Sequence, residues 1–483
     1  MQQRREPDQP RQEGWPRTNR AVPLVIDSAA AVWGASLLLT ALCAYVKGSL
    51  LNVARAAGWA LAGRAFLERR LVEAHVPASV SLPMDPQIVA IADEAAAQGR
   101  PIYLAVPRRA PLLHEIAARH PLIAEAITVD TGTYGGIDEA AAELAQHFPD
   151  GFDFIAGDRA EIVQHRPEGD AAEDAPELTV VRSRWGALPF LLRELALSLR
   201  PHQCVKNLVV FVPIVLGGQL TDAGQLINAL VAFLALSCIA SGTYLINDIW
   251  DIAEDRKHWS KRHRPIAAGR LPPATALWTA LACIGIGALL GAFVSWRAEA
   301  MLLLYLAVTL GYTVHLKTVA FVDGLVLATL FTIRLGIGAI AADVPPSPWL
   351  FVFSMFLFAS LSYAKRHTEI VKALARQGKE LGGRGYRVVD APIMLTVGVS
   401  TGIGAVMIMV LYIVEEAFRN SFYGSTSWLW GFPPLIFLFV VRIWLLSARG
   451  EMSDDPVAFA IRDRTSLALG TLLLLCFGFA WLG

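Results

Sequence analysis

Four polar residues that could bind a metal ion close a long apolar stretch of the chain. They are Asn247, Asp248, Asp251 and Asp255, spaced i, i+1, i+4 and i+8. In a helix the first, third and fourth share one face and the second lies beside it. Carboxylates this close repel one another and are costly at a membrane edge. Because Mg²⁺ takes carboxylate oxygens and bridges to phosphates, we predict Mg²⁺ as cofactor, held by the three aspartates.

Basic residues follow this acidic row directly. Their side chains suit the oxygens of a diphosphate, and they are Arg256, Lys261, Arg262 and Arg264. A plain alternative is a charged helix end with a basic loop, which explains the cations but not the spaced carboxylates. The constellation therefore predicts a site that binds Mg²⁺ and a diphosphate group.

The elements that must position this site are predicted to be membrane helices. Of the 483 residues, 54% are hydrophobic and only 17% are charged, less than the quarter or so typical of soluble domains. After about residue 205 the apolar runs are long enough to cross a hydrocarbon core about 30 Å thick. Nine spans are predicted, at roughly 205–220, 225–246, 272–294, 299–316, 319–342, 348–364, 393–414, 427–447 and 464–482.

The loops between these spans alternate in charge. Those after the second, sixth and eighth spans are rich in lysine and arginine, whereas 295–299, 343–348 and 415–427 each hold one arginine at most. Positively charged loops stay on the cytoplasmic side. We therefore expect an integral protein of a bacterial-type inner (plasma) membrane, with its N-terminus and the acidic row in the cytoplasm. The formal net charge is zero, and we expect membrane lipids but no nucleic acid among the partners.

The part before the spans is predicted to be an α/β domain. Residues 1–20 are polar and contain prolines, which predicts a disordered tail, and apolar strands are expected at 21–27, 99–106 and 152–158 within a domain of residues 21–185. The apolar segment 29–46 has two interpretations. It is either a buried or membrane-resting helix of this domain or a true membrane span.

Two motifs resemble the UbiA-type intramembrane prenyltransferase superfamily: NDxxDxxxDR at 247–256 and KRxRPIAAG at 261–269. The resemblance extends from about Leu199 to the C-terminus, and we assign residues 190–483 to this domain. It implies an all-α bundle of nine transmembrane helices with a central cavity open to the cytoplasm and laterally to lipid. The Mg²⁺-diphosphate site would lie under the loops after the second and sixth spans.

A second acidic motif that such proteins usually carry, DxxxD, is incomplete here. Asp323 is present, but Leu327 stands at the position of its partner. The second half of the site would then depend more on cations and a hydroxyl; the candidates are Tyr312, Lys317, Arg334, Lys365 and Arg366. For Asp323 and Arg334 the alternative is an intramembrane ion pair that only satisfies itself.

Other stretches resemble one branch of this superfamily, the decaprenyl-phosphate phosphoribosyltransferases. They are RPHQCVKNLVVFVP at 200–213, YAKRHTE at 363–369 and RGY at 384–386. The resemblance implies Mg-dependent transfer of 5-phosphoribosyl from phosphoribosyl diphosphate to a polyprenyl phosphate, a step in cell envelope biosynthesis. Lys206 and Asn207 of the first stretch, with Lys365 and Arg366, would bind the phosphates.

Two other functions remain open at this point. The chain could be a prenyltransferase that moves a polyprenyl group from its diphosphate to an aromatic or other small acceptor. It could also be a transporter or lipid-binding protein whose carboxylates bind a cation without chemistry. The oligomeric state is open, a homo-oligomer included.

The order of strands in the N-terminal domain resembles a haloacid-dehalogenase-like (HAD-like) phosphatase. In the first motif of that family Asp27 matches the nucleophile, but Ala29 replaces the acid, and 135–139 contains no lysine. Gly157, Asp158 and Glu161 are a partial fourth motif. Without the acid and the cation, proton donation and phosphate neutralisation are both lost. The resemblance therefore implies a degenerate, catalytically silent domain.

Overall fold

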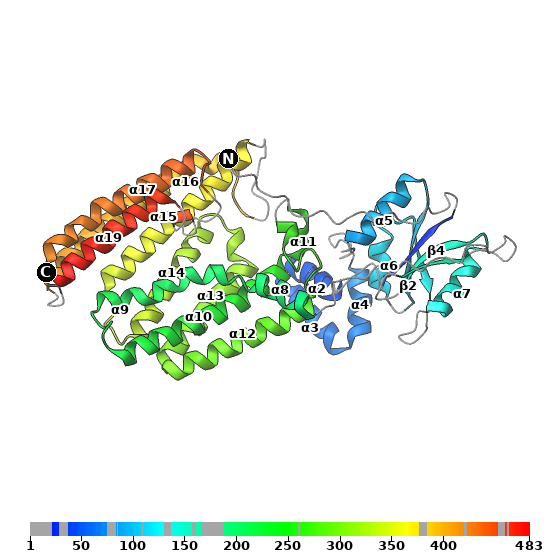
Figure 1. Ribbon diagram of the computed structural model, residues 1–483, viewed down its shortest axis with the longest axis horizontal. Coiled ribbons are helices and arrows are strands. Elements are labelled where there is room, and N and C mark those ends of the chain that lie inside the picture. The colour runs from blue at the N-terminus through cyan, green and yellow to red at the C-terminus, as the bar shows by residue number, and fades with distance from the viewer. Residues whose placement is uncertain are drawn as a thin grey trace. The chain divides into compact units, whose positions relative to one another are not determined.

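The computed structural model (Figure 1) describes residues 22–28, 37–74, 84, 86–108, 110–129, 137–156, 161–165, 188–258, 261–375, 384–419, 423–452, 459–460 and 463–483. The chain divides into two compact units. One comprises Met1–Leu192 and Trp259–Pro273, and the other comprises Arg193–His258 and Ala274–Gly483. Each unit is described below by itself.

The first unit contains a five-stranded sheet in the order β3-β2-β1-β4-β5. The strands are β1 Leu24–Asp27, β2 Ile102–Pro107, β3 Glu125–Val129, β4 Phe152–Ala156 and β5 Glu161–His165, and only β5 is antiparallel. Three helices contact strands of the sheet, namely α5 Pro86–Ala97, α6 Pro111–Ala117 and α7 Ile137–His147. Leu24 and Ile26 pack on one face and Val25 on the other, so the central strand is apolar throughout. The predicted α/β fold is confirmed.

Among the residues that carry the phosphatase resemblance, Asp27 is the one whose side chain is placed by the structure. It ends β1 and is almost fully buried. Glu161 begins β5, while Ala29, Gly157 and Asp158 lie outside the described residues. The catalytic silence of this unit stays a prediction.

The segment that could have been a further span is, in its described part, a short and partly buried helix. Helix α2, Leu37–Lys47, has 11 residues, and at 1.5 Å per residue it is about 16 Å long, too short to cross a bilayer. Its Ala41 is fully buried in the cluster that contains Leu24 and Ile26. For the described residues 37–47 the interpretation as a helix of the domain therefore agrees with the structure, while residues 29–36 lie outside the described residues. Helices α3 Leu50–Leu61 and α4 Arg64–Glu73 follow.

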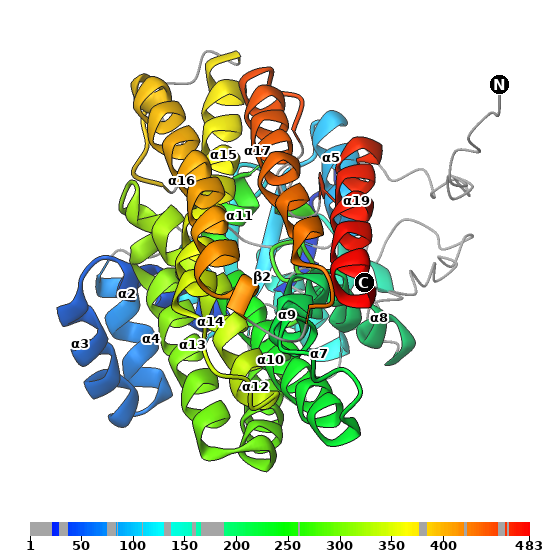
Figure 2. The same ribbon diagram turned by 90° about the vertical axis from the view of Figure 1, so that its left-hand side faces the viewer.

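The second unit is a bundle with eight helices long and apolar enough to cross a membrane among the described residues. They are α10 Ala223–Trp250, α12 Pro273–Val294, α13 Trp296–Val314, α14 Val322–Ala341, α15 Pro348–Ala375, α16 Ala391–Glu415, α17 Phe432–Ala448 and α19 Arg464–Leu482. The spans that include α16 and α17 begin with the 3₁₀ helices η6 Val388–Asp390 and η8 Thr426–Gly431. Helix α15 packs on α14, α16 and α17, and Figure 2 shows α15, α16 and α17 side by side. Eight of the nine predicted spans are confirmed as long apolar helices in an integral membrane protein.

The first predicted span, 205–220, has a different form. Its residues belong to a 3₁₀ helix, η3 Pro201–Phe211, and a five-residue helix, α9 Val212–Leu216. Pro213 lacks an N–H group, so a regular α-helix cannot run through this stretch undisturbed. Because a 3₁₀ helix rises about 2 Å per residue and an α-helix about 1.5 Å, the two together are about 30 Å long. A ninth crossing at this place stays a prediction.

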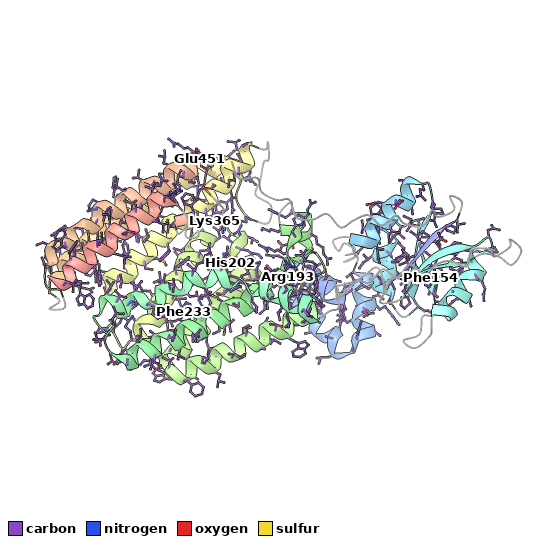
Figure 3. All side chains as sticks on the ribbon, in the orientation of Figure 1. Phe154, Arg193, His202, Phe233, Lys365 and Glu451 are labelled. Carbon is purple, nitrogen blue, oxygen red and sulfur yellow. The ribbon has the colours of Figure 1, made fainter. Side chains whose placement is uncertain are left out.

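Two helix boundaries differ from the sequence analysis where candidate site residues lie. Helix α15 continues to Ala375, because KRHTEIVKALA is rich in good helix formers. Lys365, labelled in Figure 3, is therefore on a helix and not in a loop. The same holds for Arg366. Helix α10 ends at Trp250, and Asp251 caps it with φ −93° and ψ 10° before α11, Ile252–Lys257, begins. The acidic row thus bends at Asp251 instead of following one straight helix.

Candidate active site

Asp248 forms an ion pair with Arg200, which was not among the predicted site residues. Nη2 of Arg200 donates to both carboxylate oxygens of Asp248, at 2.6 and 2.7 Å, and Asp248 is buried. Arg200 stands at the start of η3 with a left-handed φ of 54°, and its guanidinium lies 5.4 Å from the ring centroid of Tyr244. Arg200 is the first residue of the stretch 200–213, from which only Lys206 and Asn207 were predicted as site residues.

Asp251 is held by Lys317. Nζ of Lys317 lies 2.6 and 2.7 Å from its two carboxylate oxygens. Lys317 belongs to the short 3₁₀ helix η5, Leu316–Thr318, which connects α13 with α14. This ion pair joins the end of α10 to that connection, so the structure brings together two candidates that are 66 residues apart in the sequence.

Asp255 and Arg256 lie beyond the bend, on α11. Asp255 is buried, and burial lowers the pKa of the Arg256 guanidinium to about 10. In the described part of the chain no group of three or more histidine, cysteine, aspartate and glutamate side chains is close enough to hold a metal ion. The bend and the two ion pairs account for this, because each of Asp248 and Asp251 is oriented by its own cation. Their hard carboxylate oxygens nevertheless fit Mg²⁺ in chemistry.

Asp323 is the centre of a second cluster at the start of α14. It is fully buried, and Nε of Arg366 lies 2.8 Å from its Oδ2. Nη1 of Arg384 lies 3.4 Å from the same oxygen, and Tyr386 donates a hydrogen bond from its hydroxyl to Oδ1. The alternative of an intramembrane ion pair between Asp323 and Arg334 is therefore wrong. Eleven residues of helix separate the two by about 16 Å along the axis, which is too far for an ion pair.

The two arginines of this cluster differ in burial. Arg366 is 1% exposed and is enclosed by Asp323 and Glu369. The side chain of Arg384 is 21% exposed, and its Nη1 also donates to the hydroxyl of Tyr312 at 3.0 Å. Of the two arginines, only Arg384 therefore has a side chain that is partly accessible to solvent. Arg384 was missed as a candidate, although the RGY stretch contains it.

Tyr386 fixes the backbone that leads into α14. Its hydroxyl accepts a hydrogen bond from the N–H of Phe321 at 2.7 Å, and Tyr363 donates to the Phe321 carbonyl at 3.1 Å. Phe321 has φ 64°, a strained value for a residue with a bulky side chain. Burial and the charge of Asp323 raise the pKa of Tyr386, so its hydroxyl stays a donor. The two tyrosines thus hold the turn that orients Asp323.

Replacing Tyr386 by phenylalanine is expected to lower the free energy of unfolding by about 1–3 kcal/mol, because a buried carboxylate loses a donor. Tyr363→Phe should cost less, since the Tyr363 hydroxyl makes one of the hydrogen bonds above and the Tyr386 hydroxyl makes two. Chemical denaturation of both variants in the same detergent measures the difference. An equal effect of both substitutions would contradict this role of Tyr386.

Arg334 and Asn207 lie in a separate, buried network. Arg334 donates to Asn207 Oδ1 at 2.9 Å, to the Leu330 carbonyl at 2.8 Å and to the Tyr305 hydroxyl at 2.9 Å. Asn207 in turn donates to Ser237 at 3.0 Å. These bonds join η3 to α10, α13 and α14, which is the function of a structural clamp. Neither side chain is brought to the carboxylates, and the part of both in substrate binding stays a prediction.

Arg334→Lys is expected to lower the free energy of unfolding by about 2 kcal/mol, because a lysine cannot reach three acceptors on three elements at once. The Michaelis constants for the substrates should stay within a factor of about two, since the clamp lies away from the carboxylates. Denaturation and steady-state kinetics on the same preparation check both statements. A large change in a Michaelis constant with unchanged stability would instead support the predicted substrate contact.

The remaining candidates are placed as follows. Asn247 is on the last turn of α10, and Lys206 is on η3 next to Asn207. Lys261, Arg262 and Arg264 belong to the other compact unit, where Lys261–His263 forms a short 3₁₀ helix. Their contact with a diphosphate stays a prediction.

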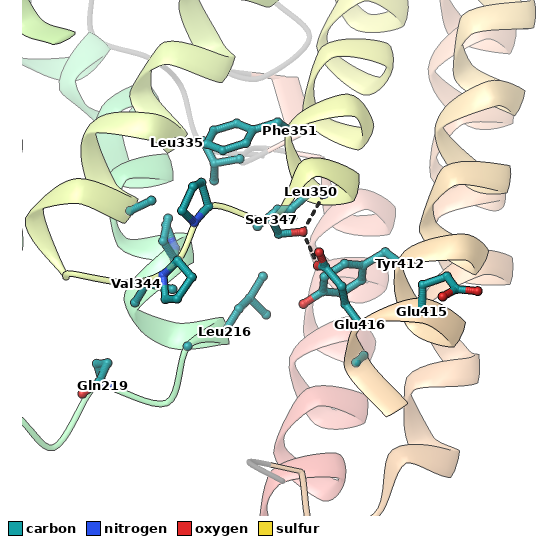
Figure 4. Close-up of a pocket in the computed structure, with 16 residues that line it drawn as sticks. Leu216, Gln219, Leu335, Val344, Ser347, Leu350, Phe351, Tyr412, Glu415 and Glu416 are labelled. Carbon is teal, nitrogen blue, oxygen red and sulfur yellow. Dashed lines mark hydrogen bonds between the residues drawn. The ribbon is translucent and has the colours of Figure 1, made fainter. Parts of the chain in front are cut away.

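A cavity of about 530 Å³ is lined by residues of α9, of α14, α15 and α16 and of the segments after α14 and α16 (Figure 4). Its lining includes Leu216 at the end of α9, Val344 after α14 and Glu416 after α16. The hydroxyl of Ser347 donates a hydrogen bond to Glu416. By contrast Asp323 begins α14, so the length of that helix separates the two places. The described lining contains carboxylates and hydroxyls but no lysine or arginine. This cavity is therefore unsuited to a diphosphate.

Comparison with known proteins identifies a family and several relatives. The model of the UbiA prenyltransferase family matches residues 210–482. The chain is 30% identical to an uncharacterized protein, y4nM, of Sinorhizobium fredii over 86% of this chain and 82% of that protein. It is 32% identical to nodulation protein NoeC of Azorhizobium caulinodans over 58% of this chain and 91% of that protein.

The chain is also 30% identical to decaprenyl-phosphate phosphoribosyltransferase of Mycobacterium tuberculosis, over 55% of this chain and 87% of that protein. Among solved structures, a UbiA homologue from Archaeoglobus fulgidus bound to GPP and Mg²⁺ is similar with a TM-score of 0.47 and 13% identity. That similarity covers 59% of this chain and 98% of the homologue.

Proposed function

The chain belongs to the UbiA prenyltransferase family, and from this premise we propose that it transfers 5-phosphoribosyl from phosphoribosyl diphosphate to a polyprenyl phosphate. The bond from the anomeric carbon of ribose to the diphosphate breaks, and a bond from that carbon to a lipid phosphate oxygen forms. The similarity to decaprenyl-phosphate phosphoribosyltransferase over 87% of that protein supports this choice of substrates.

The observation that carries the proposal is the charge of the Asp323 cluster. Among the described residues of this cluster, the carboxylates of Asp323 and Glu369 lie among three cations, which are Lys365, Arg366 and Arg384. At the end of α10, Asp248 contacts Arg200 and Asp251 contacts Lys317. A site with a cationic half can bind a phosphate directly, without a second metal ion. Phosphoribosyl diphosphate has such a phosphate in addition to its diphosphate, and an allylic prenyl diphosphate does not.

Each residue then has a part in the reaction. Mg²⁺, for which Asp248 and Asp251 are the proposed ligands with Asp255, supplies charge neutralisation to the leaving diphosphate when it is bound. Arg200 and Lys317, which contact these carboxylates, are cations for the diphosphate oxygens. Arg384 binds the ribose 5-phosphate, and Arg366 holds Asp323 in place.

The acceptor requires positioning more than activation. A lipid phosphate is already anionic at neutral pH, so the protein needs no strong base to make it a nucleophile. Placing its oxygen about 3–3.5 Å from the anomeric carbon replaces a bimolecular encounter by a fixed geometry. Lys206 and Lys365 are the proposed contacts of the lipid phosphate.

Binding of donors in the absence of acceptor tests the choice of donor. A ligand present at about a hundred times its Kd stabilises the folded state by about 2.7 kcal/mol, which raises the Tm. We expect phosphoribosyl diphosphate with Mg²⁺ to raise the Tm more than geranyl diphosphate with Mg²⁺ at equal concentration. A larger effect of the prenyl diphosphate would favour transfer of a prenyl group instead.

A further inference from the structure

Helix α3 of the N-terminal unit has an exposed surface that consists mostly of apolar side chains. Its 12 residues include a single charged side chain, Arg55. Leu51 is 69% exposed and Leu61 is 91% exposed. Val53, Ala57, Ala60 and Leu61, spaced i, i+4, i+7 and i+8, form an exposed apolar stripe along the helix. These four residues are named the α3 patch.

The α3 patch is not the side by which the helix packs on its own unit. Ala56 is the buried residue of α3, and the ring of Trp59 lies 5.0 Å from that of Tyr45 on α2. Figure 2 shows α3 beside α2 and α4, and contacts join the three helices. The stripe therefore points away from the core of the unit. Contiguous exposed apolar surface of this kind marks a place where something else binds.

The charges around the α3 patch indicate what binds. Residues 47–73 contain five basic side chains and two acidic ones. Both acids are already paired, Glu68 with Arg64 at 2.9 Å and Glu73 with Arg70 at 2.7 Å. The segment 47–73, which contains α3 and α4, therefore has three more basic than acidic side chains in its sequence. A helix with this combination is suited to the interface of a membrane that contains anionic lipids.

We propose that the α3 patch docks on the anionic lipid surface of the membrane that holds the bundle. The apolar stripe enters the boundary between headgroups and acyl chains, and the surrounding cations contact lipid phosphates. Because the same chain has eight membrane-crossing candidates, this unit is always near a bilayer, and a weak docking surface is sufficient. The membrane contact of the N-terminal unit is thus assigned to α3, whereas the apolar α2 is part of the core.

Depth-dependent quenching in lipid nanodiscs tests this. The full-length protein, with its five cysteines replaced by alanine, carries Leu61→Cys labelled with bimane, and a matched control carries Glu94→Cys, an exposed position on α5. In discs of phosphatidylcholine and phosphatidylglycerol with doxyl-labelled lipid, we expect fluorescence at position 61 to fall about threefold and at position 94 hardly to change. Unchanged Tm values show that the variants are folded.

Three further outcomes decide the proposal. Arg55→Glu combined with Arg69→Glu is expected to reduce quenching at position 61 by about half, because the lipid phosphates lose two partners. Equal quenching at positions 61 and 94, or none in any lipid, would overturn the docking. A label at position 61 that is shielded from water but not quenched by doxyl lipid would show that protein covers the α3 patch, either the bundle or a second copy, and would overturn it also.

Discussion

Asp251→Asn is expected to lower kcat for phosphoribosyl transfer by about a thousandfold. The substitution removes a carboxylate of the proposed Mg²⁺ site and leaves Lys317 without the charge that holds it at 2.6 Å. The loss affects the step in which charge develops on the leaving diphosphate, so it should appear in kcat more than in the Michaelis constants. Steady-state transfer at saturating Mg²⁺ measures it.

The same substitution at the other end of the same helix is the matched control. Asp222 is the N-cap of α10 and accepts from the N–H groups of Gly224 and Gln225. Asparagine is an equally good N-cap, so Asp222→Asn should leave kcat and Tm unchanged. An active Asp251→Asn enzyme with an ordinary Mg²⁺ requirement would contradict the proposed site.

Two arginine substitutions at the Asp323 cluster are expected to differ in effect. Arg366→Gln should lower stability, and Arg384→Gln should weaken binding of the donor. Arg366 is almost fully buried against Asp323, so its loss leaves a buried carboxylate short of its main partner. Breaking a buried pair from one side costs about 3–5 kcal/mol. We expect the Arg366→Gln variant to be severely destabilised, with a lower yield and a lower midpoint of chemical denaturation.

Arg384 is partly exposed and 3.4 Å from Asp323, so Arg384→Gln should fold. If it binds the ribose 5-phosphate, the loss of a charged hydrogen bond worth about 2 kcal/mol raises the Michaelis constant for the donor about thirtyfold. Inhibition by ribose 5-phosphate should weaken in parallel, and inhibition by diphosphate should not. If stability falls equally in both variants and donor binding is unchanged, Arg384 is structural.

The spans were the part of the fold that hydropathy could predict. A bilayer demands about 20 consecutive apolar residues per helix, and this requirement is local, so eight long helices appear where they were expected. The first span illustrates the limit. Pro213 lies within the apolar run 205–220 and Pro201 lies just before it, and a proline can end, kink or tighten a helix. The formation of a 3₁₀ helix here depends on packing against α10 and α14.

The site was predictable as a set of residue types but not as a set of pairs. The acidic row assumed one straight helix, and the bend at Asp251 coincides with its contact with Lys317, a residue far away in sequence. Arg334 could have been excluded as the partner of Asp323 from helix geometry alone. That Arg366 and Arg384 take its place depends on how α15 and the 384–386 segment pack on α14, and no local pattern encodes this.

The most direct test of the central claim is transfer itself. Purified protein in detergent is incubated with polyprenyl phosphate, Mg²⁺ and radiolabelled phosphoribosyl diphosphate, with Asp251→Asn in parallel. We predict that label moves into the lipid phase and that the substitution and a chelator both abolish this. No transfer from this donor, together with consumption of an allylic prenyl diphosphate in the same preparation, would contradict the proposal and identify a prenyltransferase.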